Sequence, residues 1–320
     1  MQKINQLIVN SAIAHGLDVI GDRWSLLILR DAFLGRSRFE QFRRHSGISK
    51  ATLTRRLDAL ITEGVLYKGL RSEGAKRSEY RLTEKGSGLF FSSLLAWQWE
   101  LEWGTAEQER QEEQLPHKLF HRTCQHELYP QAVCKHCRQT FGVDDVQLTS
   151  ASPDAALQLD VIKSLSGQRR VRSSVKSGEE DVNLANISDL IGDRWTLLLL
   201  ISAFFGLKRY DGFLKQLNIA SNILTARLKF LVEVGVFERH SYQANPPRSE
   251  YHLSDKGRSL YPIVMAMRQW VVDGLTLQEY STVLIHKSCG QNLVVDVECR
   301  ACVQQPMLNS VQFIESELGT

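Results

Sequence analysis

The sequence of 320 residues lacks any long hydrophobic run. Its best apolar stretch, residues 197–205, is about half of the 18 or so residues that a membrane-spanning helix needs. The N-terminus carries a lysine but no uninterrupted apolar segment followed by a small-residue cleavage site, so we expect no signal peptide. These absences predict a soluble, cytoplasmic chain with no membrane partner.

The sequence also lacks the motifs that carry common chemical reactions. It contains no phosphate-binding glycine loop, no Gly-x-Ser-x-Gly elbow and no arrangement of paired carboxylates. We therefore expect no enzymatic activity and no catalytic residue. The net charge is only +3, so a surface for nucleic acid has to come from local clusters of Lys and Arg.

An internal repeat organises the chain. The pentapeptide Ile-Gly-Asp-Arg-Trp occurs at 20–24 and again at 191–195, an offset of 171 residues. The offset holds without a gap from 20–86 to 191–257, with 28 identities in 67 positions. Such a long register indicates a duplication. We call the two repeats, each with the segment that follows it, copy 1 and copy 2.

Each copy predicts three helices followed by a hairpin. In copy 1 an apolar helix is expected over 24–34, a short helix over 38–45, and a third helix from the N-cap Ser49 to about residue 63. Residues 65–70 and 77–82 read as the two strands of a hairpin, and 83–86 opens a long final helix. This order is typical of a winged helix-turn-helix module. The polar stretch 148–183 is expected to be a linker.

These motifs resemble a known family. The segments 21–29, 38–39, 47–49, 53–57 and 79–86, with 192–200, 224–228 and 246–251 in copy 2, are similar to the HxlR-type regulators over roughly 180 residues. The resemblance implies DNA binding as a two-fold dimer and regulation of transcription. Single modules are usual in that family, so the tandem arrangement departs from it.

The predicted third helix of copy 1 is suited to the major groove. In a helix-turn-helix the second helix of the motif presents its N-terminal residues to base edges. Arg and Lys suit guanine edges and phosphates, and hydroxyl groups suit either. The candidate DNA-binding residues of the helix are Ser49, Lys50, Thr52, Thr54, Arg55 and Arg56, and those of the hairpin are Arg71, Lys76 and Arg77. The alternative is a solvated basic helix in a protein-interaction module.

Copy 2 carries a weaker version of this surface. Its candidate DNA-binding residues are Ser221, Asn222, Thr225, Arg227 and Arg248, and it has no counterpart of Lys50 or Arg55. Copy 1 is therefore expected to dominate the phosphate contacts. For copy 2 we also keep open a pairing or effector domain with little DNA contact.

Cysteine is scarce, and all six cysteines fall into two sets with the same spacing. The sets are His121-x2-Cys124-x9-Cys134-x2-Cys137 and His286-x2-Cys289-x9-Cys299-x2-Cys302. In a reducing compartment such cysteines serve as metal ligands or free thiols more often than as disulfides. Two ligand pairs nine residues apart can close a hairpin around one tetrahedral Zn²⁺. We expect two structural zinc ions per chain, one in each set, with disulfides or unrelated thiols as the alternative.

These expectations combine into one architecture. The fold class is α+β, mainly α, with module 1 over 1–110, a zinc hairpin over 115–147, the linker, module 2 over 184–277 and a second zinc hairpin over 280–308. The function is sequence-specific DNA binding at an imperfect palindromic operator. The alternative is a protein-interaction subunit built from winged helices and zinc ribbons. The modules are expected to pair within one chain or between two chains, with a small-molecule effector left open.

Overall fold

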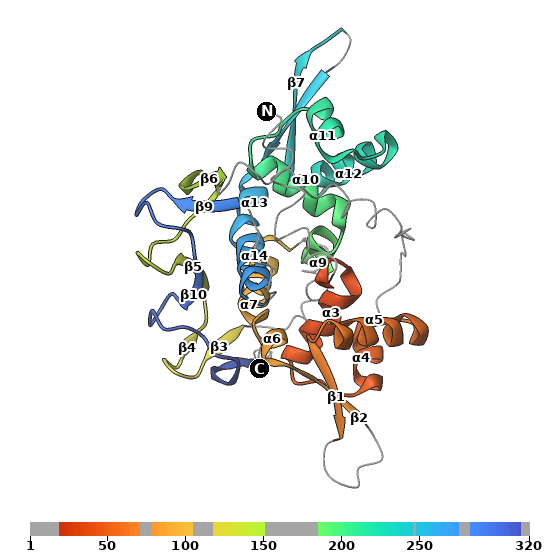
Figure 1. Cartoon of the computed structure of the whole chain (residues 1–320), viewed down its shortest axis with the longest axis vertical. Coiled ribbons are helices and arrows are strands. Elements are labelled where there is room, and N and C mark those ends of the chain that lie inside the picture. Colours follow the sequence, from red (N-terminus) through yellow and green to blue (C-terminus); the bar gives the residue numbers. More distant parts are fainter. Residues whose placement is uncertain are drawn as a thin grey trace, which may run out of the picture. The chain divides into compact units, whose positions relative to one another are not determined.

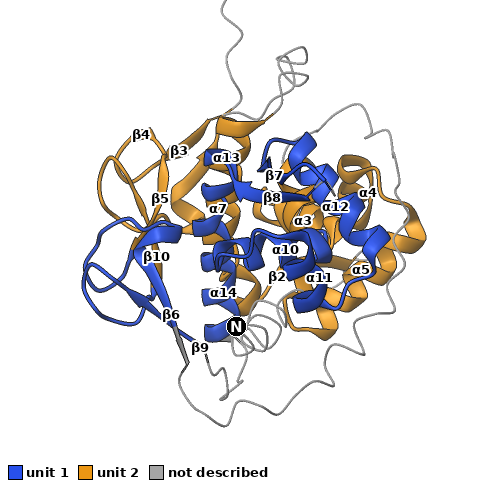
Figure 2. Cartoon of the chain, turned by 90° about the horizontal axis from the view of Figure 1, so that it is seen from above, with its two compact units in different colours: residues 1–16, 134–173, 193–294 blue, residues 17–133, 174–192, 295–320 orange. Residues whose placement is uncertain are grey.

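The computed structural model describes residues 19–70, 78–104, 118–150, 185–245, 248–274 and 282–314. The chain divides into two compact units (Figure 2). Unit 1 takes residues 1–16, 134–173 and 193–294, and unit 2 takes residues 17–133, 174–192 and 295–320. Each unit therefore contains one winged helix-turn-helix and shorter segments from the other copy. No helix in the described ranges is long and apolar enough to cross a membrane.

The helix-turn-helix of copy 1 consists of α3 (Arg23–Phe33), α4 (Phe39–Ser46) and α5 (Lys50–Thr62) (Figure 1). Asp22 caps α3 by accepting hydrogen bonds from two backbone N–H groups of the first turn. Gly47, at φ +63°, ends α4 in the left-handed conformation that glycine adopts without strain. Ser49 then caps α5, and the buried stripe of α5 is Leu53, Leu57 and Leu60.

The wing and the final helices of copy 1 follow directly. Strands β1 (Leu66–Leu70) and β2 (Ser78–Leu82) form an antiparallel hairpin, which leads into α6 (Glu84–Ser87) and α7 (Phe90–Trp103). A glycine is required at residue 86, since a Cβ there would clash with the carbonyl oxygen of Val65. The expected last helix is thus two helices, a short one and a long one.

Copy 2 reproduces these elements. Its helices are α10 (Arg194–Phe204), α11 (Tyr210–Leu217), α12 (Ser221–Glu233), α13 (Asp255–Arg258) and α14 (Tyr261–Gly274), and its wing is β7 (Phe237–Gln243) with β8 (Arg248–Leu253). The recognition helices α5 and α12 begin at residues 50 and 221, a difference of 171, which is the offset of the sequence repeat.

A further helix, α9 (Ala185–Ile191), leads into copy 2 but belongs to unit 2, where it contacts α3 and α7. Glu100 of α7 is only 9% exposed, and its carboxylate accepts hydrogen bonds from the backbone N–H groups of Asn186 and Ile187 at 3.3 and 2.8 Å. Arg23 at the start of α3 forms an ion pair of 2.6 Å with Asp189. Copy 1 thus caps and holds the helix that leads into the module of copy 2.

The segments after α7 and α14 form strands that pair across the copies. Copy 1 supplies β3 (Leu119–His121), β4 (His126–Glu127), β5 (Pro130–Cys134) and β6 (Val146–Ser150), and copy 2 supplies β9 (Thr282–His286), β10 (Val295–Cys299) and β11 (Val311–Phe313). The sheet orders are β11-β3-β4, β10-β5 and β6-β9. The linker expected from residue 148 therefore starts later, because residues 148–150 belong to β6.

Candidate nucleic-acid interface and metal centres

The N-terminal half of α5 offers an exposed, basic face. Ser49, Lys50, Thr54 and Arg55 are exposed and Thr52 is half-buried. Within the described ranges no ion pair or hydrogen bond engages the side chain of Lys50 or Arg55; the backbone carbonyl of Lys50 accepts a hydrogen bond from the Thr54 hydroxyl at 3.0 Å. A cationic side chain that the fold does not use is free to meet a base edge or a phosphate oxygen.

Arg56, which the sequence also predicted to bind DNA, contacts another residue of the module. Its Nε lies 3.2 Å from Oδ1 of Asp22, an ion pair without a well-directed hydrogen bond. In copy 2 the equivalent Arg227 makes two hydrogen bonds to Asp193, at 3.1 and 2.9 Å. Asp22 and Asp193 are the N-caps of α3 and α10, the first helix of each module. The repeated Asp and Arg therefore tie the recognition helix to the first helix of each module.

The recognition helix of copy 2 has a neutral first half. Ala220 stands at its N-cap position and makes no side-chain capping bond. Ser221, Asn222 and Thr225 are exposed. The Thr225 hydroxyl donates to the carbonyl oxygen of Ser221 at 2.8 Å, as threonines within helices commonly do.

The structure describes the strands of both wings but not residues 71–77 at the tip of the first wing. Arg71, Lys76 and Arg77 lie outside the described residues, so their expected phosphate contacts stay a prediction. In copy 2 Arg248 is exposed at the start of β8.

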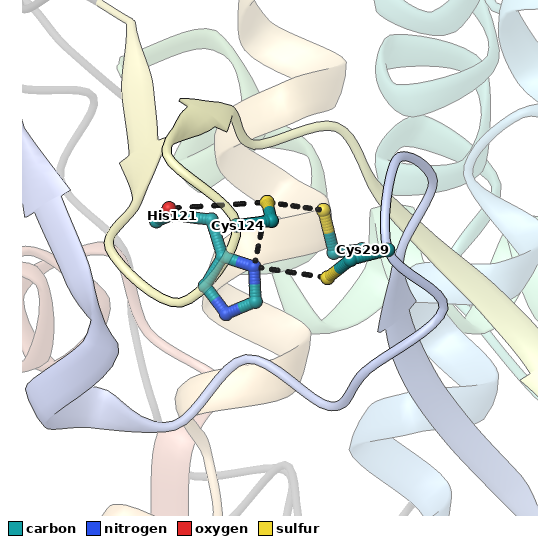
Figure 3. Close-up of side chains that lie close together, drawn as sticks. His121, Cys124 and Cys299 are labelled. Carbon is teal, nitrogen blue, oxygen red and sulfur yellow. Dashed lines mark hydrogen bonds between the residues drawn. The ribbon is translucent and has the colours of Figure 1, made fainter.

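The cysteines and two histidines gather into two clusters, one in each unit. The first is His121, Cys124, Cys299 and Cys302, and the second is Cys134, Cys137, His286 and Cys289. In the first, Nδ1 of His121 lies 3.4 Å from Sγ of Cys124 (Figure 3). The same nitrogen lies 3.4 Å from Sγ of Cys302. The two sulfur atoms of Cys124 and Cys299 are 3.9 Å apart. Such a separation is far beyond a disulfide bond of about 2.05 Å.

The second cluster has the same geometry. Nδ1 of His286 lies 3.3 Å from Sγ of Cys137 and 3.4 Å from Sγ of Cys289. Cys134 and Cys289 place their sulfur atoms 4.0 Å apart. Zinc bonds of about 2.3 Å to sulfur and 2.0–2.1 Å to nitrogen put the corners of a tetrahedron about 3.5–3.8 Å apart. Both clusters therefore fit a metal ion of this size.

The grouping of the ligands differs from the expected one. We predicted that each copy closes its own set of four, and this grouping was wrong. Each cluster combines the His-x2-Cys pair of one copy with the Cys-x2-Cys pair of the other. The physical reason is strand pairing between the copies. A single nine-residue hairpin is too small to bury apolar side chains. In the paired strands Leu128, Val133 and Val297 are at most 1% exposed.

All four ligand pairs adopt the same tight turn. In each pair the residue after the second ligand donates its N–H to the carbonyl oxygen of the first at 2.8 Å, and its φ is positive; these residues are Gln125, Arg138, Gly290 and Val303. A branched residue such as Val303, at φ +60°, rarely adopts this conformation, which costs about 1–3 kcal/mol. The strain concentrates at the ligand turns, as expected where a bound ion fixes the backbone. No sequence pattern predicted this strain.

The electrostatics of His121 and Cys134 also suit a metal. Both histidines are fully buried, and burial lowers the pKa of His121, which favours the neutral ring that a metal needs. Burial opposes ionisation of the Cys134 thiol, but hydrogen bonds from the backbone of Cys137 and His136 outweigh it and lower its pKa. A thiolate is the form of cysteine that binds a metal. For Cys137 a hydrogen bond from the Gln139 backbone lowers the thiol pKa, but burial and the neighbouring thiols raise it overall.

Comparison with known proteins identifies the family. The model of the HxlR-like helix-turn-helix matches twice, at residues 19–108 and 190–279. The chain belongs to this family. It is a DNA-binding transcriptional regulator in which the family's module is duplicated.

Several known proteins are similar to a part of this chain. An uncharacterized HTH-type transcriptional regulator of Mycobacterium bovis is 35% identical over 127 residues, which are 39% of this chain and 80% of the relative. The regulator YdeP of Bacillus subtilis is 37% identical over 83 residues, 26% of this chain and 65% of YdeP. Among solved structures, the transcription-factor candidate PA1374 of Pseudomonas aeruginosa is 29% identical, covers 42% of this chain and 93% of its own, and has a TM-score of 0.34.

Proposed function

We propose that this HxlR-like regulator reads an imperfect palindromic operator with α5 and α12, and that α5 provides the stronger half. The observation that carries the proposal is the pair of exposed, unengaged cations on α5, Lys50 and Arg55. Their counterparts in α12 are Ser221 and Ala226, which carry no charge. Arg56 and Arg227 have a structural role in this proposal, because Asp22 and Asp193 hold them.

The chain is proposed to supply both half-site readers by itself. Related regulators with one module need two chains to present two recognition helices. Here each compact unit already includes segments of both copies, which supports an intramolecular pseudo-dimer. A homodimer of chains with four winged helices is the competing arrangement, and it predicts a longer operator.

Each Cys3His cluster is proposed to bind one structural Zn²⁺. The supporting observations are the ligand spacing, the burial of both histidines and the strained turns. Four protein ligands leave no open coordination position, so the ion would stabilise small sheets rather than perform chemistry. A need for reduced thiols at these sites supports our proposal that the protein acts in the cytoplasm.

Fluorescence anisotropy with DNA from upstream of the protein's own gene tests the DNA proposal. We expect specific binding to exceed binding to unrelated DNA by at least about a thousandfold at physiological salt. Footprinting should show two unequal half-sites. Equal affinity for both DNAs would instead favour a protein-interaction role. Elemental analysis of the purified chain should give two zinc ions per chain.

A further inference from the structure

The ligands of each metal cluster come from distant parts of the chain. Cys124 and Cys299 are 175 residues apart, and Cys137 and His286 are 149 residues apart. An ion held by such ligands closes a very long loop. An ion held within one copy would close only the short turn between neighbouring ligand pairs.

The sequence alone permits either grouping, because each copy carries a full set of one histidine and three cysteines. The strand ladders decide between them. Val311 of β11 pairs with His121 of β3, and Val146 of β6 pairs with His286 of β9. Both ladders therefore run through a ligand histidine and bring a strand of the other copy beside it.

In both ladders a backbone hydrogen bond continues the pairing just beyond the ligand histidine. Arg122 donates to the carbonyl oxygen of Ser310 at 2.8 Å, and Lys287 donates to that of Asp145 at 2.9 Å. Near the second cluster, Arg258 of α13 forms an ion pair of 2.7 Å with Asp144. The segments that carry the ligands are thus anchored to the other copy by contacts that do not involve the metal.

We infer that the two metal ions act as reciprocal clasps, each fastening the His-x2-Cys pair of one copy to the Cys-x2-Cys pair of the other, and that high-affinity DNA binding requires them. The inference rests on the zinc binding proposed above. The ions hold the copies together as one assembly, so that neither recognition helix works independently of the other copy. Loss of the metal leaves the copies joined by the linker and by weaker contacts.

Zinc content of paired cysteine variants tests the grouping. In the crossed arrangement Cys124→Ser and Cys302→Ser damage the same site, so the double variant should keep one zinc ion per chain. Cys124→Ser with Cys137→Ser damages both sites and should keep none. Cys137 and Cys302 hold the same place in the repeat, so the two double variants are matched controls for each other. Grouping within each copy predicts the reverse result and would overturn the inference.

A measurement on the wild-type chain covers the case in which the variants do not fold. Chelator is added until one zinc ion per chain is left, and the free thiols are then alkylated and mapped by mass spectrometry. In each molecule either Cys124, Cys299 and Cys302 or the other three cysteines should stay protected from alkylation together. Joint protection of Cys124, Cys134 and Cys137 would contradict the clasps.

The effect of zinc on operator affinity is measured with the same wild-type protein. Complete removal of zinc should lower operator affinity by about a hundredfold or more, since two linked half-site contacts become independent. Re-addition of Zn²⁺ should restore it. A metal-free chain that binds the operator as tightly as before would refute the requirement for the clasps, although the DNA-binding function would stand. A wild-type chain without zinc would instead refute the proposed metal binding itself.

Discussion

Copy 1 and copy 2 share the same arrangement of helices and wing but differ in charge on the first half of the recognition helix. Both use an aspartate to cap the first helix and to hold an arginine of the recognition helix. Both need a glycine, Gly86 or Gly257, against the backbone before the wing. The recognition faces differ, with Lys50 and Arg55 in copy 1 against Ser221 and Ala226 in copy 2. The duplication has retained these caps and close backbone contacts and has changed the faces that we propose meet the DNA.

The interiors of the two modules also differ. In copy 1 the fully buried Asp31 accepts hydrogen bonds from Arg30 at 2.8–3.0 Å and forms an ion pair with Arg36 at 3.4 Å. Burial raises the pKa of the Asp31 carboxyl even though both arginines oppose the shift. Copy 2 has Ile201, Ser202 and Leu207 at these places. A buried ionic cluster thus does in one copy what apolar packing does in the other.

The largest effect is expected from breaking that cluster. Asp31→Ser should lower the free energy of unfolding by about 3–5 kcal/mol, because it removes the buried carboxylate that pairs with both Arg30 and Arg36. The double change Arg30→Ile with Asp31→Ser installs the pair found in copy 2 and should recover most of the loss. Chemical denaturation measures both. A double variant as unstable as the single one would show that the two interiors are not interchangeable.

The next largest effect concerns DNA contacts of α5. Lys50→Ala and Arg55→Ala should each weaken operator binding by about 1–3 kcal/mol if the side chain reads a base. Thr225→Ala on α12 gives a comparison in copy 2, and we expect little change because its hydroxyl already bonds to the helix backbone. Anisotropy titrations against the operator measure the losses. Unchanged binding in both α5 variants would show that copy 1 does not contact the operator through these residues.

A gain is expected when the missing cations are supplied to copy 2. Ser221→Lys with Ala226→Arg should strengthen DNA binding by about 1–2 kcal/mol. Each new phosphate contact should also steepen the dependence of log K on log salt by about 0.9. If α12 lies away from the DNA, neither the affinity nor the salt slope will change, and copy 2 is then a pairing domain.

The smallest effect concerns the helix caps. Ser49→Ala should destabilise module 1 by about 1 kcal/mol, because the N–H of Thr52 loses its acceptor. Ala220→Ser should stabilise module 2 by a similar or smaller amount. Thermal melts of the two variants against the wild type measure the opposite shifts. Shifts of the same sign would show that the caps of α5 and α12 are not equivalent.

The sequence was sufficient for the modules. The offset of 171 residues predicted two equivalent helix-turn-helix units, and the periodic leucines and the caps placed α5 within a residue or so of its observed bounds. It did not reveal that Arg56 and Arg227 are tied to Asp22 and Asp193. Polar residues at helix starts and on helix faces look alike in a sequence, whether they meet DNA or each other.

The metal ligands mark the limit of the sequence most clearly. Spacing and duplication identified His121, Cys124 and the six other members of the two Cys3His clusters, because local turns bring each pair together. Only the tertiary structure decided which pairs combine. Two copies with the same donors are chemically equivalent, so ligand chemistry cannot distinguish the groupings. The choice depends on long-range strand pairing, β3 with β11 and β6 with β9, and on the apolar side chains that those ladders bury.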